Sequence, residues 1–342
     1  MSDQASFIEW LVSSCDLSAL VQATDSFDNT PVHLAAQAGK ENAVKQLLHL
    51  GSDLGAREEN GKSPMHLAAE NGHTETVRIL FNADGGVADL LTDDPYRETP
   101  LHLAVTARQE ETVKLLLSLK PDSRRISNRN GETALDYAAR KGFNDLIDLL
   151  FEDQDTKKYD RKNTPLHFAA EHDHIDTVKL LVDKGASVTS VNKYDQTPLD
   201  LAIKYGREKI VQFLLGHPDV RLKDRRGNTL LHVAAREGHI EIFRQILDIK
   251  KEEIDVNSTN QDEDTPLHLA ADKGRGDMVD FLIGLNNDGY EPLDCAKMWG
   301  HKDVVDSLVN KFGAGSHVIN GLKGEDEGDK EDEASYFTES ED

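Results

Sequence analysis

Cysteine, aromatic residues and long apolar runs are all scarce in this chain of 342 residues. The two cysteines, Cys15 and Cys295, lie near opposite ends of the sequence, and unpaired thiols are typical of a reducing compartment. The first residues lack the basic segment and apolar core of a signal peptide, and no stretch reaches the ~18 apolar residues of a membrane span. We therefore expect a soluble protein of the cytoplasm, with the nucleus as the alternative, and no membrane insertion.

Positive charge is also in deficit. Lysine and arginine total 39 against 63 aspartate and glutamate residues, which gives a formal net charge of −24 and an isoelectric point near 4.9. Such a chain repels the phosphates of nucleic acids and of anionic lipids. Nucleic acid and anionic membrane surfaces are therefore disfavoured as partners of the chain as a whole.

Sequence signatures of catalysis are missing too. There is no P-loop, no G-x-S-x-G and no C-x-x-C. His172 and His174 flank Asp173, but this string falls short of a metal-ligand set, and we interpret it as the polar end of a helix. The sequence predicts no enzyme, no cofactor and no metal site.

One short string recurs along the chain: threonine, proline, leucine and histidine, or a close variant. Its threonine position recurs at intervals of 26 to 36 residues, about 33 on average. Nine copies in one register predict a repeat array in which each unit packs only on its neighbours. The threonine position falls at Thr30, Ser63, Thr99, Thr133, Thr164, Thr197, Thr229, Thr265 and, in degenerate form, Glu291.

Each position of the repeat has a physical role. The threonine hydroxyl is expected to cap a helix, and proline suits the first helical turn because its missing N–H costs nothing there. Paired alanines such as Ala68 and Ala69 allow these helices to pack closely. A glycine nine residues after the cap, such as Gly72 or Gly142, favours a left-handed helix end. The apolar spacing of the next run, 177–182 for example, predicts an amphipathic second helix.

With this motif and period, residues 25–312 resemble ankyrin repeat proteins. The resemblance implies an all-α solenoid of helix-turn-helix units with β-hairpin loops, stacked into a curved elongated array. We predict an N-terminal helical cap over 1–24, about nine ankyrin repeats over 25–312, and an acidic disordered tail over 313–342. Long arrays of this kind are also similar to the N-terminal regions of A-type transient receptor potential channels.

Two repeats depart from the glycine pattern. Repeat three has Arg97 and Arg108 at the hairpin and helix-ending glycine positions. Repeat five has Lys162 and Asp173 there. Because non-glycine residues tolerate positive φ less well, we predict that these two repeats are local weak points of the stack.

The histidines of the repeat motif are expected to be structural. Stacked helices lie about 10 Å apart, so these imidazoles do not converge on one metal ion. Each is predicted to hydrogen-bond to the neighbouring hairpin, and Asp136, Asp200 and Asp294 to make a similar bond where they replace histidine. The six histidines are His33, His66, His102, His167, His232 and His268.

The resemblance implies that a partner protein binds the concave face, which is built from hairpin tips and the exposed side of the first helix. In repeats four to seven these positions form a basic strip with two tyrosines, and Tyr and Arg are favoured at interfaces. The alternative is that these are solvated surface charges without a role. The strip comprises Arg129, Arg140, Lys141, Arg161, Lys193, Tyr194, Lys204, Tyr205, Arg225, Arg226 and Arg236.

Charge complementarity predicts the kind of partner. An acidic or phosphorylated segment of another protein fits the basic strip, and so does the acidic tail, in which 325–333 reads EDEGDKEDE. The leading hypothesis is a non-catalytic scaffold or adaptor, expected to be a monomer. The alternative is that the chain is the cytosolic ankyrin portion of a larger membrane protein, such as a transient receptor potential type ion channel.

Overall fold

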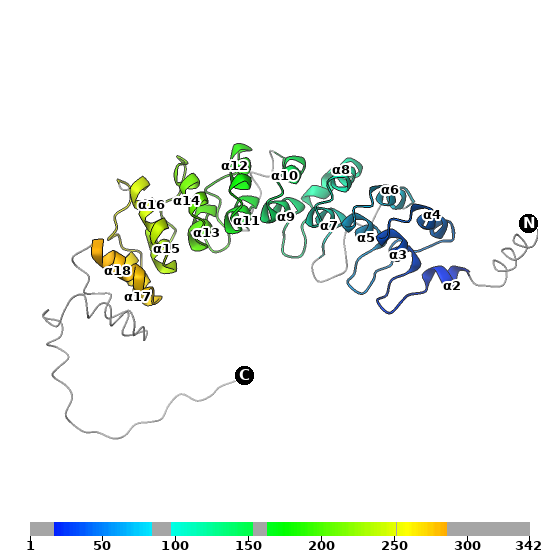
Figure 1. The fold of residues 1–342 in the computed structure, drawn as a ribbon, viewed down its shortest axis with the longest axis horizontal. Coiled ribbons are helices and arrows are strands. Elements are labelled where there is room, and N and C mark those ends of the chain that lie inside the picture. The colour runs from blue at the N-terminus through cyan, green and yellow to red at the C-terminus, as the bar shows by residue number, and fades with distance from the viewer. Residues whose placement is uncertain (1–16, 84–96, 153–162, 251, 286–342) are drawn as a thin grey trace, which may run out of the picture.

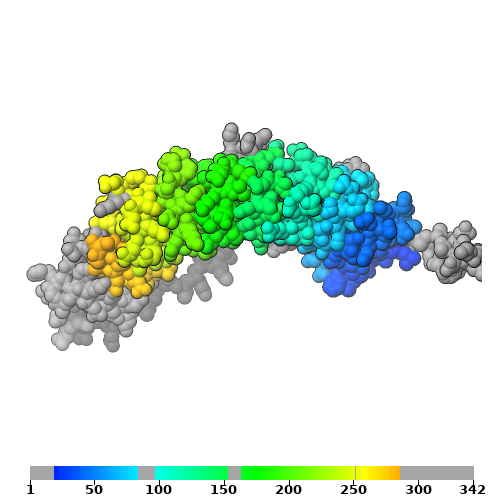
Figure 2. Space-filling view, turned by 45° about the horizontal axis from the view of Figure 1, so that its top comes forward, coloured from blue at the N-terminus to red at the C-terminus, as the bar shows by residue number. Residues whose placement is uncertain are grey.

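The computed structural model describes residues 17–83, 97–152, 163–250 and 252–285. Within these residues the regular structure is helical, without a β-strand, and short helices follow one another in pairs. Figure 1 shows the pairs side by side in one row that bends into an arch. The space-filling view in Figure 2 shows the same arch. The predicted all-α curved solenoid is confirmed.

Each pair has an inner helix on the concave side and an outer helix on the convex side (Figure 1). The inner helices are α3 (Pro31–Gln37), α5 (Pro64–Glu70), α7 (Pro100–Thr106), α9 (Ala134–Lys141), α11 (Pro165–Glu171), α13 (Pro198–Lys204), α15 (Leu230–Glu237) and α17 (Pro266–Asp272). The outer helices are α4 (Glu41–His49), α6 (Thr74–Ala83), α8 (Glu110–Leu119), α10 (Asn144–Leu150), α12 (Ile175–Asp183), α14 (Glu208–Leu215), α16 (Ile240–Lys250) and α18 (Gly276–Leu285). Helix α2 (Leu17–Gln22) precedes them, and the 3₁₀ helix η1 (Pro121–Arg125) follows α8.

These pairs are repeats one to eight of the predicted array. Three predicted parts of the chain lie outside the described residues. They are residues 1–16 of the N-terminal cap, the ninth repeat with Asp294, and the acidic tail from residue 313. The hairpin loops that the structure describes are short turns, and in repeat seven one isolated antiparallel bridge joins Lys223 to Thr229.

The inner helices begin where the sequence predicts. In repeat three, Thr99 Oγ1 accepts from the backbone N–H of His102 at 3.3 Å, and His102 Nδ1 accepts from the backbone N–H of Thr99 at 3.2 Å. This reciprocal box satisfies two donors that a helix start leaves unbonded. It is present in every described repeat, with Asp136 and Asp200 in place of histidine in repeats four and six.

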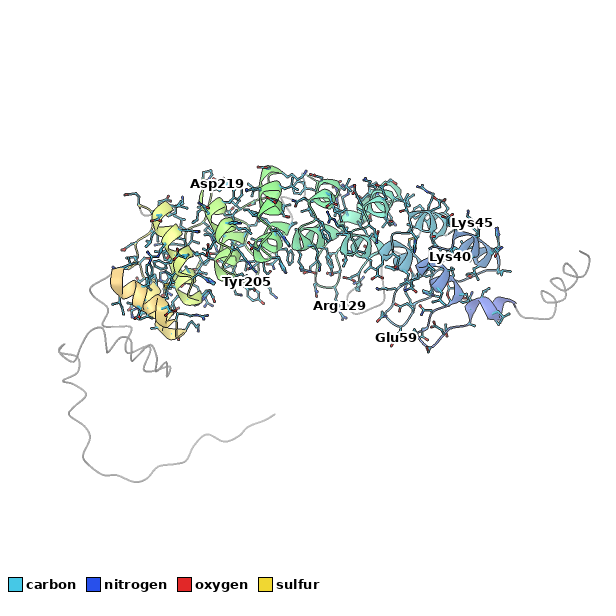
Figure 3. The ribbon with its side chains drawn as sticks, in the orientation of Figure 1. Lys40, Lys45, Glu59, Arg129, Tyr205 and Asp219 are labelled. Atoms are coloured by element: carbon cyan, nitrogen blue, oxygen red, sulfur yellow. The ribbon has the colours of Figure 1, made fainter. Side chains whose placement is uncertain are left out.

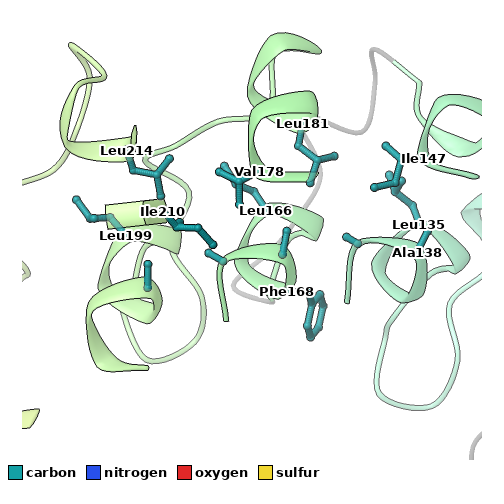
Figure 4. Packing of buried hydrophobic residues seen from close by; sticks show 14 of the residues in the cluster. Leu135, Ala138, Ile147, Leu166, Phe168, Val178, Leu181, Leu199, Ile210 and Leu214 are labelled. Carbon is teal, nitrogen blue, oxygen red and sulfur yellow. The ribbon is translucent and has the colours of Figure 1, made fainter. Parts of the chain in front are cut away.

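One apolar core runs along the stack between inner and outer helices (Figure 4). In repeat five, Leu166 enters it from α11 and Leu181 from α12, and both side chains are fully buried. Ala169 and Ala170 are fully buried too, and their small size lets successive inner helices approach closely. Each repeat therefore completes the core of its neighbours and depends on them for burial.

The helix-ending glycine is required for two reasons. Gly142 has a φ of +71°, a conformation that side chains with a Cβ rarely adopt. In addition, a Cβ on Gly142 would lie 2.6 Å from Nδ1 of His174 in the next repeat. His174 is fixed there because its Nε2 donates to the carbonyl of Arg140 at 2.9 Å.

Most junctions between described repeats are clamped in this way by the residue ten positions after the cap. The exception is the junction of repeats three and four, where the equivalent residue is Phe143. There the Arg108 guanidinium lies 5.1 Å from the Phe143 ring centroid and pairs with Asp145 at 3.3 Å. The other clamps are His73 to the Gln37 carbonyl, Gln109 to Glu70, Arg207 to Glu171, His239 to Lys204 and Arg275 to Arg236.

We expect Gly142→Ala to lower the free energy of unfolding by about 2 kcal/mol, from positive φ and from displacement of the His174 clamp. Gly185→Ala is the matched control, since Gly185 has a φ of +86° and a Cβ added to it would meet no heavy atom within 4 Å. We expect the control to lose about 1 kcal/mol, from φ alone. Urea unfolding followed by circular dichroism measures both variants. Equal losses would contradict the role assigned to the clamp.

Positive φ at non-glycine residues bears on the predicted weak points. Arg97, Arg108 and Asp173 have φ values of 53°, 55° and 65°, as the sequence predicts, whereas Lys162 lies outside the described residues. Three further hairpin positions of this kind were not predicted: Asp28, Asp195 and Glu263, in repeats one, six and eight. Repeats three and five remain distinct because their helix-ending position also lacks glycine.

Amide hydrogens of repeats three and five are therefore expected to exchange faster than those of repeats two and seven. Non-glycine residues at positive φ, Arg97 and Arg108 in repeat three and Asp173 in repeat five, lower the free energy needed to open these repeats locally, by about 1 kcal/mol or more. Hydrogen exchange with mass spectrometry reports each repeat separately. Equal protection in the four repeats would refute the prediction.

Candidate protein-binding surface

The hairpin tips are held by a residue five positions before the cap, which the repeat motif did not predict. In repeat six, Asn192 Oδ1 accepts from the backbone N–H groups of Tyr194 at 2.9 Å and Gln196 at 3.0 Å. Its Nδ2 donates to Oδ1 of Asn163 in the preceding repeat at 2.9 Å. The signal was present in the sequence, because Asn or Asp recurs at this register position in Asp25, Asn128, Asn192, Asp224 and Asn260.

Neighbouring hairpins are also joined to one another. The N–H of Gln261 donates to the Arg226 carbonyl at 2.8 Å, and the N–H of Arg225 donates to Asp195 Oδ2 at 2.9 Å. At the other end, the N–H of Glu59 donates to the Phe27 carbonyl at 2.9 Å. These bonds hold the tips in a fixed order, so side chains on successive tips form one surface.

Four of the six motif histidines make the predicted bond to the next hairpin. For His66 the prediction is wrong, because its buried Nε2 has no hydrogen-bond partner in the part of the chain that the structure describes, and the hairpin after His268 lies outside that part. His102 Nε2 donates to the Glu132 carbonyl at 3.0 Å, and His167 Nε2 to the Gln196 carbonyl at 2.9 Å. Burial lowers the pKa of both imidazoles to about 4, so they are neutral at pH 7. His33 and His232 make equivalent bonds. The motif histidines are thus structural.

Asp136 and Asp200 bond to their own helix caps, but the predicted bond to the next hairpin is wrong for Asp136, whose buried Oδ1 has no hydrogen-bond partner among the described residues. The carboxylate of each accepts from the backbone N–H of its capping threonine at 2.7 Å. Asp200 also lies 3.5 Å from an Arg221 guanidinium nitrogen of the next repeat. Burial raises the pKa of Asp136 to about 7.

The string around Asp173 is likewise engaged in the fold. His172 Nδ1 bonds to the Phe168 carbonyl at 3.0 Å, and His174 is the clamp described above. The described residues contain no group of three side chains placed to hold a metal ion. The imidazoles therefore serve helix ends and repeat junctions.

Figure 3 places two residues of the basic strip on the concave edge. Arg129 and Tyr205 point to the same edge of the arch as Glu59, whereas Asp219 lies on the opposite edge. Arg161 lies outside the described residues. The two labelled members of the strip thus lie on the concave side, one at a hairpin tip and one at the end of an inner helix.

Three arginines of the strip are matched by acids within the fold. Arg140 pairs with Glu132 and lies 4.3 Å from the Phe168 ring centroid. Arg225 pairs with Asp195 at 3.2 Å, and Arg236 pairs with its neighbour Glu237 at 3.1 Å. Their positive charges are therefore partly neutralised by carboxylates of the same protein.

Four bases of the strip form no ion pair with any residue that the structure describes: Lys141, Lys193, Lys204 and Arg226. Repeat six contributes two of them. Lys204 stands where repeat four has Arg140, and the residue before the cap of repeat six is the neutral Gln196, where repeat four has the Glu132 that pairs with Arg140. Each lysine of repeat six lies over its own tyrosine neighbour.

The two lysine–tyrosine pairs of repeat six come from different elements. Lys193 Nζ lies 4.8 Å from the Tyr194 ring centroid at the hairpin tip, and Lys204 Nζ lies 5.1 Å from the Tyr205 ring centroid at the end of α13. Tyr194 is 70% exposed and Tyr205 40% exposed. They are the two exposed tyrosines among the described residues.

Repeats two and eight, near the ends of the described stack, carry acidic residues at positions where the strip has basic ones. In repeat two, Lys62 pairs with Glu70 at 2.8 Å, while Glu59 at the tip is exposed. In repeat eight the equivalent positions carry Asp262, Asp264 and Asp272. The four bases described above, which form no ion pair with a described residue, belong to repeats four, six and seven, between these acidic positions.

Comparison with known proteins agrees with this architecture. A family model described as Ankyrin repeats (3 copies) matches in overlapping stretches: 1–89, 85–160, 143–224, 190–259, 211–288 and 231–319. Transient receptor potential cation channel subfamily A member 1 homolog of Caenorhabditis elegans is 33% identical over 153 residues, 42% of this chain. Transient receptor potential cation channel subfamily A member 1 of Homo sapiens is 29% identical over 243 residues, 67% of this chain.

The chain corresponds to only part of those relatives. The matched regions cover 12% of the Caenorhabditis elegans protein and 21% of the human protein. In the part of the chain that the structure describes, no helix is both long and apolar enough to cross a bilayer. The similarity therefore concerns the repeat array.

Proposed function

Because the chain belongs to the ankyrin repeat family, we propose that it is a non-catalytic scaffold that binds an acidic or phosphorylated segment of a partner protein on its concave face. The observation that carries this proposal is the set of bases without an ion pair in repeats four, six and seven, two of which, Lys193 and Lys204, lie over exposed tyrosines. Lysine and arginine beside aromatic rings suit carboxylates and phosphates, and Tyr and Arg are favoured anchors at interfaces.

The bases to be substituted in a test are those that form no ion pair within the described part of the fold. Reversing Arg140 or Arg225 would break ion pairs with Glu132 or Asp195 and disturb the fold along with the surface. The concave variant is therefore Lys193→Glu, Lys204→Glu and Arg226→Glu. The matched convex variant is Lys45→Glu, Lys179→Glu and Lys209→Glu, three exposed lysines of the outer helices α4, α12 and α14.

Affinity purification with mass spectrometry from cells that express wild type, concave variant or convex variant tests the function. We expect partners captured by wild type to be retained by the convex variant and lost from the concave variant. Equal capture by the two variants would overturn the concave site.

A second candidate function follows from the relatives. The chain could be the ankyrin portion of a longer protein related to subfamily A transient receptor potential cation channels, since it covers 12% and 21% of two such relatives. Sequencing full-length transcripts tests this candidate. An open reading frame that continues past Asp342 into apolar spans would support it, and a stop codon directly after Asp342 in every transcript would rule it out.

A further inference from the structure

We propose that the two lysine–tyrosine pairs of repeat six bind the C-terminal residues 331–342 of the same chain. This inference rests on the concave surface proposed above and names one ligand that regulates it. The surface combines two cations with two exposed aromatic rings. A complementary ligand therefore carries carboxylates next to aromatic side chains.

The C-terminal segment has this composition. Residues 331–342 read EDEASYFTESED, with Tyr336 and Phe337 at the centre and acidic residues on both sides. They are the two aromatic residues of the predicted tail, 313–342, so the remaining acidic stretch, 325–330, offers charge alone. Carboxylates are attracted to lysine, and aromatic rings stack on tyrosine, so both parts of the segment find a counterpart in repeat six.

Hydrogen bonds fix the backbone that carries the two lysine–tyrosine pairs. Asn192 fixes the tip that carries Lys193 and Tyr194, through its bonds to the backbone of that turn. At the other pair, the carbonyl of Lys204 accepts from His239 Nε2 of the next repeat at 3.2 Å. The two pairs are thus held on two elements of one repeat, and a ligand that spans them contacts both without reordering the backbone.

Repeats four and eight do not offer an equivalent surface. In repeat four, the base at the end of the inner helix is Arg140, which pairs with Glu132. In repeat eight, Asp262 and Asp272 occupy the equivalent positions and repel an acidic ligand. Among the described repeats, the combination of two bases without an ion pair and two exposed tyrosines is found in repeat six.

The chain is long enough for this contact. The 18 positions from Gly313 to Glu331 span up to about 60 Å when extended. Repeat six lies three repeats from the predicted ninth repeat, about 30 Å at the ~10 Å spacing of packed helices. A tethered ligand reaches a millimolar effective concentration, so even weak contacts keep the surface covered until a partner displaces the segment.

The test uses the full chain and a tail variant that carries Glu331→Gln, Asp332→Asn, Glu333→Gln, Tyr336→Ala and Phe337→Ala. A fluorescent peptide of residues 329–342 is titrated against both forms, and fluorescence anisotropy measures its affinity. We expect the peptide to bind the tail variant at least 10-fold more tightly than wild type, because the chain's own segment no longer competes. Adding Lys193→Glu and Lys204→Glu to the tail variant removes this gain, whereas adding Lys179→Glu and Lys209→Glu preserves it.

A second probe, a fluorescent hexaglutamate peptide, separates failure of this inference from failure of the proposed function. Equal affinity of the 329–342 peptide for wild type and tail variant overturns the tail contact. If hexaglutamate nevertheless binds and is lost with Lys193→Glu and Lys204→Glu, the binding surface stands without the tail. If no probe responds to those two substitutions, the surface itself is refuted. A dimer in wild type that is absent from the tail variant, seen by analytical ultracentrifugation, would assign the segment to a second copy and overturn the contact within one chain.

Discussion

Leu166→Ala is expected to lower the free energy of unfolding by about 3 kcal/mol, the middle of the range for a buried leucine. Leu166 is fully buried in the centre of the array, where α11 packs between α9 and α13. The surrounding backbone is fixed by caps and clamps, so the cavity collapses only in part and the loss stays large. Neighbouring repeats lose stability too, because each repeat completes the core of the next.

Leu34→Ala is the control for this prediction. Leu34 also lies on an inner helix, but it belongs to the first repeat and its side chain is 45% exposed. We expect it to lose about 1 kcal/mol or less, in proportion to the apolar area that it buries. Urea unfolding followed by circular dichroism compares the midpoints. A loss at Leu166 no larger than at Leu34 would contradict the continuous core.

Charge reversal on the concave face is expected to weaken binding of an acidic ligand by about 100-fold, which corresponds to about 2.7 kcal/mol. Lys193→Glu, Lys204→Glu and Arg226→Glu turn three attractive charges into repulsive ones, and each exposed charge contributes up to about 1 kcal/mol. The affinity is measured with hexaglutamate on the tail variant, so that the chain's own C-terminus does not compete. We expect most of the loss in the association rate, since exposed charges steer encounter.

The same measurement at high salt is an internal control. At 1 M salt the Debye length falls to about 3 Å, which screens exposed charges. The tail variant should therefore bind hexaglutamate with nearly the same affinity whether or not the three bases are reversed. The convex variant, with Lys45, Lys179 and Lys209 reversed, should bind hexaglutamate as the unreversed chain does at every salt concentration. A loss of about 100-fold in the convex variant would mean that net charge alone governs binding.

The repeat fold could be predicted because its determinants are local. A threonine three residues before a histidine forms its cap within one helical turn, and a glycine adopts positive φ through its own backbone. The positions of Thr99, His102 and Gly142 therefore indicate the architecture from the sequence alone. The clamps between repeats, which the motif did not predict, join residues 34 to 39 positions apart, as when His174 bonds to the Arg140 carbonyl.

The candidate surface could be predicted only in outline for the same reason. Register placed Arg140 and Arg225 on the concave face, but their ion pairs with Glu132 and Asp195 depend on how side chains turn in the folded stack. Asp195 lies at the tip of repeat six by its register, yet it accepts from the backbone of Arg225 in repeat seven. Which bases are left for a partner is a property of the packing of neighbouring hairpins.

Hydrogen exchange of the full chain, with and without its captured partner, tests the central claim most directly. If the concave face of repeats four to seven binds the partner, amides of the hairpins around Asn192 and Asp224 and at the end of α13 should exchange at least several-fold more slowly in the complex. Amides of the outer helices α12 and α14 should be unchanged. Protection confined to those outer helices, with the hairpins unaffected, would contradict the account.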